Sequence, residues 1–380
     1  MPSLEQSLRA STRWLVVLML WLLPWLQMVN SGFSVQRFKT DRTWDSPVVI
    51  PKDGVYLVSI IADPCERCVS ILHVYCQCQG TKRILLTAYG SRIYGHGEVA
   101  TGLKRNDKLF IEKVGKLEAW SSLAVVYVAN LNSFYISALN ALRTKSSPVT
   151  YTYHLTPNGW STLNNANKIT AFNISTTSMY WVTARLNPMS RVVYMTVKIG
   201  AKDLFTVYAE KTKAVSASGA FHLTAGSNIW AVTRGGTYGP QTLLSAVYLA
   251  GNKKPSTYPF EHLAFTAKFP FRRHVAAKEV FQFKHVLTNY GYIYVDGYTE
   301  IRRTGSYMVS IRPDPESASV VIVNLYVNGR LYWVIYAEDG VPVGATISLS
   351  LQVGSYLEVR NVKATTLGDG AMFSIAFIQP

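Results

Sequence analysis

The chain has 380 residues, of which 48% are hydrophobic and 12% aromatic, and it carries a formal net charge of +16. This apolar content supplies sizeable hydrophobic cores and excludes a globally disordered chain, and the length suits two or three domains. The 23 tyrosines, with many Val, Ile and Thr, favour strands over helices.

The N-terminal segment has the pattern of a secretory signal peptide. Two arginines, Arg9 and Arg13, precede the apolar block of residues 14–29. Pro24 interrupts that block, and small residues follow it. This order predicts removal of residues 1–31 and a secreted, extracellular protein without a membrane span. The alternative is an uncleaved signal anchor, because the block is close to the length that spans a bilayer.

Three segments of the chain share one pattern of strands and turns. Tyr56, Tyr180 and Tyr307 each begin an apolar strand, which a loop and a long apolar hairpin follow. A later strand–turn–strand segment and an apolar closing strand also recur, at a spacing of 120 to 129 residues. We predict an internal triplication in which each repeat is a complete domain, because solenoid units are far shorter.

The repeats have the strand and turn pattern of a β-sandwich. Many short strands between turn signals are typical of sandwiches and jelly rolls. The expected fold class is therefore all-β, with three tandem jelly-roll domains at residues 33–133, 149–251 and 262–380. Polar, proline-bearing segments at residues 137–149 and 251–262 are expected as linkers.

The strand that begins each repeat is apolar on both faces. The three tyrosines and their i+2 and i+4 neighbours should lie between two sheets, since successive side chains point to opposite faces. The other face carries a large apolar residue in each repeat: Leu57, Trp181 and Met308. An apolar patch of this kind usually marks an interface, so we expect another β-sandwich to cover it.

One chain would cover these faces if its three domains closed around a pseudo-threefold axis. The residues expected near that axis come from the opening and closing strands: Leu57, Trp181, Met308, Val126, Val247 and Ala376. Linkers of about a dozen residues span ~40 Å, enough to step between neighbours. The alternative is a homotrimer of whole chains, which would crowd three copies of Trp181 together. Covalent linkage favours the intrachain form, because it raises the effective concentration of the second and third domains around the first.

All four cysteines lie in the first repeat, at Cys65, Cys68, Cys76 and Cys78. A Cys-x-Cys pair matches zinc-ligand spacing poorly, and secretion favours disulfides. Cys76 and Cys78 share one face of a strand, about 26 Å of extended chain beyond Cys68. The bond between Cys65 and Cys68 is therefore the easiest to reach. For the other two, free thiols or an intermolecular bridge are alternatives.

The basic residues are scattered along the chain. Candidates for binding polyanions such as sulfated glycans occur in pairs: Lys104, Arg105, Lys253, Lys254, Arg272, Arg273, Arg302 and Arg303. A solvated basic surface that only keeps the protein soluble is the alternative. A nucleic-acid partner is not expected, because the sequence holds no recognisable nucleic-acid-binding module.

The sequence contains no catalytic or cofactor-binding motif. Its seven histidines form no ligand-spaced set, and neither a nucleophile elbow nor a phosphate-binding loop is present. We therefore expect a non-enzymatic protein without a cofactor or metal. The sequon at Asn173, in a polar turn, is the candidate for glycosylation.

The third repeat resembles the globular head of complement component 1q. Residues 281–311 match that family's opening signature, and residues 373–378 match its terminal strand. The opening match includes these residues: Val286, Leu287, Thr288, Asn289, Gly291, Gly305 and Tyr307. The first repeat is similar through residues 50–60 and 103–111. The second repeat is the most divergent, because Thr177 and Ser178 replace the expected glycine region.

This resemblance implies a jelly roll related to tumour necrosis factor, found as trimers in secreted recognition proteins without enzymatic activity. The chain lacks the collagen-like Gly-x-y stalk of such proteins, so complement activation is not carried over. Some family trimers bind calcium. Because Ser227 and Ser355 stand at the positions equivalent to Asp107, no metal site is carried over.

We expect, from these observations together, a secreted recognition protein that binds glycans, cell or microbial surfaces, or a receptor. The alternative is a structural component of an extracellular matrix or coat, assembled through its tyrosine-rich, basic surfaces.

Overall fold

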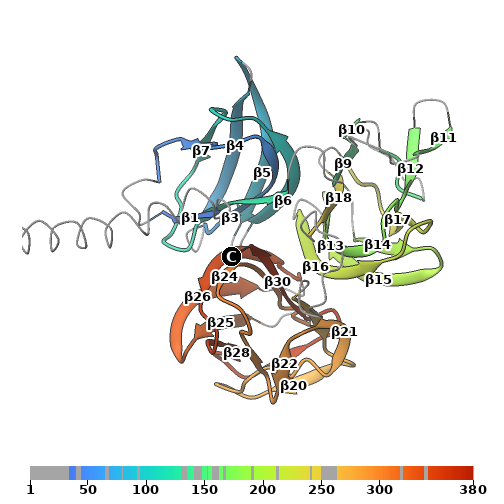
Figure 1. The fold of residues 1–380 in the computed structure, drawn as a ribbon. Coiled ribbons are helices and arrows are strands. Elements are labelled where there is room, and N and C mark those ends of the chain that lie inside the picture. Colours follow the sequence, from blue (N-terminus) through green and yellow to red (C-terminus); the bar gives the residue numbers. More distant parts are fainter. Residues whose placement is uncertain are drawn as a thin grey trace, which may run out of the picture.

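In the computed structural model the described residues are 34–39, 44–64, 68–78, 80–91, 95–129, 135–140, 148–151, 153–155, 162–165, 168–189, 192–210, 214–239, 242–249, 263–316, 320–337 and 341–379. The regular elements of these segments are β-strands, and none of the segments holds a helix able to cross a membrane. The strands build three β-sandwich domains (Figure 1), so the predicted fold class is confirmed. The expected signal peptide lies outside the described residues.

The first domain is a sandwich of two antiparallel sheets of four strands each. The inner sheet, which faces the other domains, has the order β1-β8-β3-β6, and the outer sheet has the order β2-β7-β4-β5. The strands are β1 (Ser34–Phe38), β2 (Val48–Val49), β3 (Gly54–Ala62), β4 (Val69–Cys78), β5 (Thr81–Ser91), β6 (Gly95–Leu103), β7 (Lys108–Val114) and β8 (Ser122–Ala129).

The second domain repeats this arrangement with five strands in each sheet. Its inner sheet has the order β10-β9-β18-β13-β16, and its outer sheet β11-β12-β17-β14-β15. The strands are β9 (Tyr135–Asn140), β10 (Tyr153–Leu155), β11 (Thr162–Asn165), β12 (Lys168–Asn173), β13 (Ser178–Leu186), β14 (Val193–Ile199), β15 (Lys202–Ala209), β16 (Val215–Leu223), β17 (Asn228–Gly235) and β18 (Thr242–Tyr248).

The third domain has an inner sheet of order β21-β19-β30-β24-β27 and an outer sheet of order β22-β23-β28-β25-β26. β20 and β29 form a separate pair. The strands are β19 (Ala264–Lys268), β20 (Arg273–Val275), β21 (His285–Tyr290), β22 (Ile293–Val295), β23 (Tyr298–Glu300), β24 (Gly305–Arg312), β25 (Val321–Val327), β26 (Arg330–Ala337), β27 (Ala345–Leu351), β28 (Tyr356–Asn361), β29 (Thr365–Leu367) and β30 (Met372–Gln379).

Residues 137–149 were expected as a linker, but the parts of this segment that the structure describes, 137–140 and 148–149, contribute to the second domain. β9 pairs antiparallel with β18 along its whole length. Val149 is fully buried, and its backbone N–H donates to Ala231 O at 2.8 Å. The prediction was wrong because polar residues also occur in strands that have one solvated face. The other expected linker, 251–262, lies outside the described residues.

A tyrosine anchors the strand next to the edge strand of each inner sheet, and we call these three strands, β3, β13 and β24, the central strands. The hydroxyl of Tyr180 donates to Thr176 O at 2.8 Å, and Tyr56 and Tyr307 make the equivalent bond four residues back along the chain. Each ring also meets an aromatic ring of the closing strand edge-on. The recurring tyrosines therefore mark one structural position, at the start of β3, β13 and β24.

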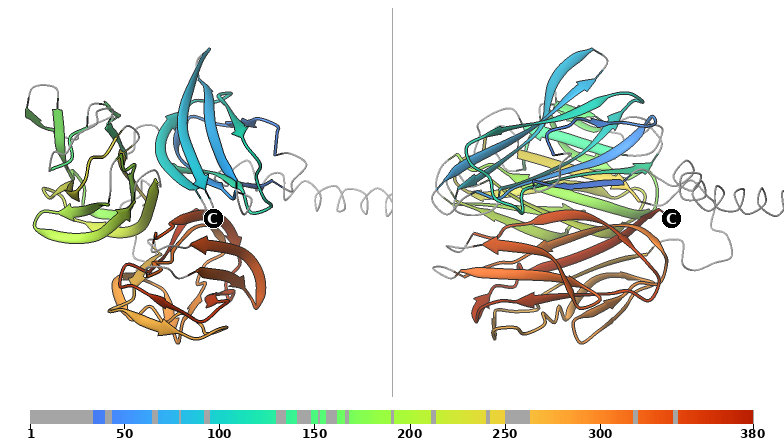
Figure 2. Two further views of the ribbon diagram at one scale, coloured as in Figure 1. Left: turned by 180° about the vertical axis from the view of Figure 1, so that it is seen from behind. Right: turned by 90° about the vertical axis from the view of Figure 1, so that its left-hand side faces the viewer.

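The three domains surround a common centre, and the views in Figures 1 and 2 agree on this arrangement. Each inner sheet ends in an edge strand that packs on the inner sheet of the next domain. β6 contacts β9, β13 and β18; β16 contacts β19, β24 and β30; and β27 contacts β1, β3 and β8. The contact therefore runs head to tail around a ring, the heterologous type that closes when the rotation fits.

Candidate functional site

A buried apolar cluster fills the centre of the ring. It contains all six residues expected near a pseudo-threefold axis: Leu57, Trp181, Met308, Val126, Val247 and Ala376. The tyrosine face of the same strands packs separately, inside each sandwich. The central strands are apolar on both faces because one face fills the sandwich and the other fills the ring.

Each edge strand of the ring has an outward backbone group that pairs with a side chain of the next domain. Ala220 N on β16 donates to Thr266 Oγ1 of the third domain at 3.0 Å, and that hydroxyl donates to Ala220 O at 2.8 Å. At the equivalent positions, Ala100 N donates to Ser245 Oγ at 3.2 Å and Ser348 N to Gln36 Oε1 at 3.1 Å. Side chains of the next domain therefore replace the missing neighbouring strand.

The carboxylate of Glu98 lies within this interface and is fully buried. Its Oε1 accepts from Trp181 Nε1 at 2.7 Å, from Ser218 Oγ at 3.1 Å and from Thr183 Oγ1. All three donors belong to the second domain, whereas Glu98 belongs to the first. Its Oε2 lies 4.0 Å from His96 Nε2.

Burial dominates the electrostatics of this polar centre. It raises the pKa of Glu98, and the hydroxyl and indole donors oppose that shift. Burial, with a contribution from Arg185, lowers the pKa of His96 to about 3. The imidazole is therefore neutral at physiological pH and supplies no counter-charge to Glu98. The group is closed to solvent and serves the packing of domains rather than binding a ligand from solution.

An open groove lies between the second and third domains and has a volume of about 540 Å³. Volumes of this order are typical of ligand sites, which favour domain interfaces. The second domain supplies the ends of β14 and β16 and the start of β15, and the third domain supplies β21. The lining residues are Ile199, Lys202, Asp203, Leu204, Phe221, His222, Thr224, Ser227, Leu287, Thr288, Asn289 and Tyr290.

The groove combines aromatic and polar groups. The rings of His222 and Tyr290 stack across the domain boundary, with centroids 5.6 Å apart and planes at 22°. Asp203 pairs with Lys198 at 2.5 Å, and Lys202 is exposed beside it. The site therefore offers an aromatic face, hydroxyl groups, an amide and both signs of charge. Sequence reasoning missed it, because its two walls are at least 60 residues apart in the chain.

The described polyanion candidates belong to the first and third domains. Lys104 and Arg105 lie with Lys108 around a shallow hollow of about 340 Å³ at the β6–β7 turn. In the third domain, Arg272 pairs with Glu316, Arg273 with Glu279, and Arg302 with Glu300; Arg303 lies 4.6 Å from the centre of the Phe377 ring. Lys253 and Lys254 lie outside the described residues. The β6–β7 turn therefore brings the candidates Lys104 and Arg105 together with a third cation, Lys108.

Two of the cysteines form a disulfide near this turn. Cys76 is bonded to Cys78, with the Cα atoms 5.3 Å apart. Neither the free-thiol nor the intermolecular alternative therefore holds for this pair in the structure. Cys68 is also disulfide-bonded, and Cys65 lies outside the described residues.

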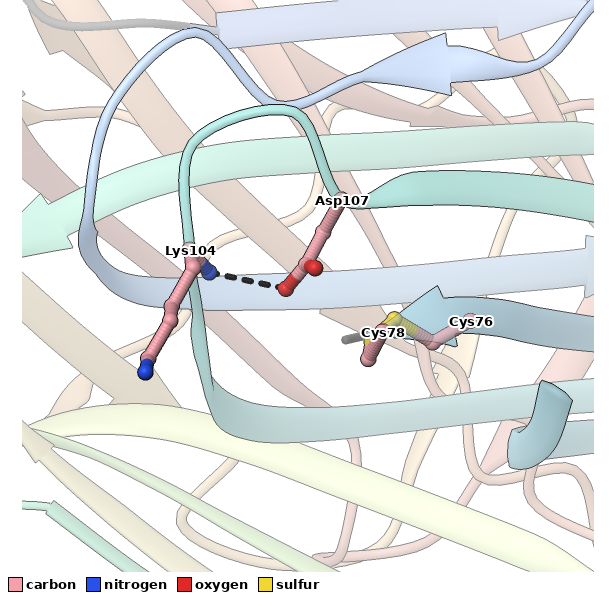
Figure 3. The surroundings of a disulfide bond; sticks show 4 residues. All are labelled: Cys76, Cys78, Lys104 and Asp107. Atoms are coloured by element: carbon pink, nitrogen blue, oxygen red, sulfur yellow. Dashed lines mark hydrogen bonds between the residues drawn. A yellow bond between two sulfur atoms is a disulfide. The ribbon is translucent and has the colours of Figure 1, made fainter. Parts of the chain in front are cut away.

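The Asp107 carboxylate lies within 4.8 Å of both sulfurs of this disulfide. Figure 3 shows it turned across its loop toward Lys104, whose backbone N–H donates to Asp107 Oδ2 at 2.8 Å. Because both sulfurs are used in the disulfide, these three side chains offer no thiolate to a metal. The carboxylate closes the β6–β7 turn.

The sequon residue Asn173 ends β12 with its side chain in use. Its Nδ2 donates to Gly226 O at 3.3 Å and to Asn228 Oδ1 at 3.2 Å. A glycan on this nitrogen would leave it a single N–H, so at least one of the two bonds would be lost. The structure thus gives Asn173 a role in the neighbouring turn, and its glycosylation stays a prediction.

No protein-family model and no curated protein matches the chain. Solved structures with weak similarity include PNGF-II, with 9% identity, 91% of this chain and 88% of that chain covered, and a TM-score of 0.25. The tandem CBM22 domains of Paenibacillus barcinonensis Xyn10C have 10% identity and a TM-score of 0.19, and the match covers 65% of this chain and 98% of that chain. A Sulfolobus Turreted Icosahedral Virus structure has 9% identity and a TM-score of 0.20, and the match covers 92% of this chain and 89% of that chain. These similarities assign neither a family nor an activity.

Proposed function

We propose that the protein is a secreted, non-enzymatic recognition protein that binds glycans in the groove between its second and third domains. The observation that carries the proposal is the groove itself, with its stacked His222 and Tyr290 beside polar and charged side chains. The resemblance of the repeats to complement component 1q heads supports the trimeric, extracellular form. In this form residues 1–31 are removed and one chain supplies all three domains.

The chemistry of the groove suits a sugar. A pyranose ring has an apolar face, which packs on an aromatic ring, and a rim of hydroxyls that act as donors and acceptors. Tyr290 is 41% exposed and offers such a face. Asn289, Asp203 and Lys202 supply an amide, a carboxylate and an ammonium in reach of the rim. Because these groups belong to two domains, recognition depends on the closed ring.

An array of neutral and sulfated glycans, probed with the purified chain, tests this proposal. The best-retained glycan is then titrated against Tyr290→Ala and against Tyr194→Ala, which removes a similarly exposed tyrosine (44%) from β14 outside the groove. We expect Tyr290→Ala to weaken binding about tenfold, as the loss of one aromatic contact does, and Tyr194→Ala to have no effect.

Two outcomes would contradict the proposal. One is the absence of any retained glycan, and the other is equal affinity of both variants and the parent chain. Assembly of the purified chain into insoluble polymers would support the structural alternative of a matrix or coat component.

A further inference from the structure

The register of the inner sheets places Glu98 at a position that recurs in every domain. Three residues after each anchoring tyrosine, the central strand faces an equivalent residue of the edge strand: Ser59 faces Glu98, Thr183 faces Ser218, and Ser310 faces Thr346. This level of the ring therefore holds one carboxylate and two hydroxyls. Two residues earlier, the central strands place three different side chains: Leu57, Trp181 and Met308.

Glu98 and Trp181 complement each other across the boundary between the first and second domains. The indole Nε1 of Trp181 donates to Glu98 Oε1 at 2.7 Å, and both side chains are fully buried. The third domain has Thr346 and Met308 at these two positions, which offer neither a carboxylate nor an indole. The pair therefore occurs once in the ring.

A ring made of three identical first domains would bring three copies of Glu98 to one buried level. Leu57 would replace Trp181 as the neighbour, so the carboxylates would lose their indole donor and face one another. Burying like charges without donors is strongly unfavourable. A ring of three second domains would instead hold three copies of Trp181 in the space that one of them fills now, which overpacks the centre.

We infer that Glu98 and Trp181 form a matched acceptor–donor pair that admits only one first domain and one second domain into each ring. The chain then closes its own trimer instead of stacking three homotypic rings from three chains. The pair acts like a buried polar residue in a coiled coil, which selects partners by penalising the wrong ones. This role does not depend on which ligand the groove binds.

The number of carboxylates at this level is tested with Ser218→Glu, which places a second carboxylate opposite Thr183. We expect its thermal midpoint to fall below that of the parent chain at pH 7.5, and the difference to shrink at pH 4.5, where carboxylates take up protons. Ser350→Glu is the matched control, because it adds a carboxylate at an exposed position of β27. Equal midpoints for Ser218→Glu and the parent chain at pH 7.5 would overturn the inference.

The pairing of the carboxylate with the indole is tested by moving both groups to the next domain boundary of the ring. A fourfold variant (Glu98→Ser, Ser218→Glu, Trp181→Met, Met308→Trp) transfers the pair to the second and third domains. A twofold variant (Glu98→Ser, Ser218→Glu) moves only the carboxylate, which then has Met308 as its neighbour. We expect the fourfold variant to have the higher thermal midpoint and to keep the mass of one chain in light scattering. A twofold variant that is as stable as the fourfold variant would contradict the pairing.

Discussion

Single buried polar residues distinguish the three domains, which otherwise share one topology. Glu98 has a serine and a threonine at its equivalent positions, and three of its donors come from the second domain. His96, which contacts it, stays neutral at physiological pH because burial lowers the pKa of its imidazole. Glu98 thus selects the neighbouring domain but lowers the stability of the fold. The cost arises because a buried carboxylate must either bind a proton or lose its hydration as an anion.

The stability lost by burying the Glu98 carboxylate depends on pH, and this dependence is tested with Glu98→Gln. Burial raises the pKa of Glu98 in the folded state above its value in the unfolded chain. Its contribution to stability is therefore complete below the unfolded pKa and is lost as pH rises through the folded pKa. We expect Glu98→Gln to match the parent chain near pH 4.5 and to exceed its unfolding free energy at pH 8. The gain is about 1.4 kcal/mol for each unit by which the two pKa values differ.

Urea unfolding at several pH values measures this difference. Comparing the variant with the parent at each pH cancels the contribution of Asp63, whose pKa burial raises to about 6. Glu358→Gln is the control, because that buried carboxylate is paired with Arg360 at 2.8 Å. This variant should lose stability at pH 8. A Glu98→Gln variant that is less stable than the parent at pH 8 would show that the carboxylate is held as a stabilising anion.

The edge strand is the element that joins the domains. An edge strand presents a row of unpaired N–H and C=O groups, which invites aggregation when nothing covers it. In this protein β6, β16 and β27 are the edges of their inner sheets and lie inside the ring. Side-chain hydroxyls and an amide of the next domain pair with their backbone groups. Closing the ring therefore protects three edges at once.

Thr266→Val tests this account of the edge strands. The substitution keeps the shape of the side chain but leaves Ala220 N and Ala220 O without their partner. We expect a loss in unfolding free energy of roughly 1–3 kcal/mol for each of these two buried groups. Thr299→Val is the matched control, since Thr299 is buried and its hydroxyl makes no hydrogen bond within the described residues. A stability loss in Thr299→Val as large as that in Thr266→Val would contradict the account.

The whole molecule is a closed ring of three unequal domains with a basic surface. Head-to-tail contacts complete the ring within one chain, so no inner sheet of the three is left for another copy to cover. The full chain carries a net charge of +16. Ion pairs neutralise several of the third domain's arginines, whereas Lys104, Arg105 and Lys108 share the hollow at the β6–β7 turn.

We expect the chain to be retained on a heparin column at low ionic strength and released at moderate salt, because exposed charges are screened within a Debye length of about 8–10 Å. The triple variant Lys104→Ala, Arg105→Ala, Lys108→Ala should elute at clearly lower salt than the parent chain. Arg272→Ala should elute close to the parent, since Arg272 is already paired with Glu316. Equal elution of the triple variant and the parent would exclude the β6–β7 turn as a polyanion site.

The amino-acid sequence by itself was enough to predict the sandwich fold, its threefold repetition and six of the side chains in the central cluster. Period-two alternation assigns residues to the two faces of a strand, and residues such as Leu57 and Trp181 are too apolar for a face exposed to water. These are local properties, readable within a few residues. The place of β9 was not predicted, because a short polar strand differs little from a linker until its partner β18 is known.

Only the tertiary structure decided which distant residues meet. Glu98, Trp181 and Ser218 come from two domains, and nothing in their local sequence distinguishes a buried carboxylate from a solvated one. The groove likewise exists only where β16 and β21 are brought together by the closing of the ring. Burial and partner geometry set the energies of these groups, and both depend on the packing of whole domains.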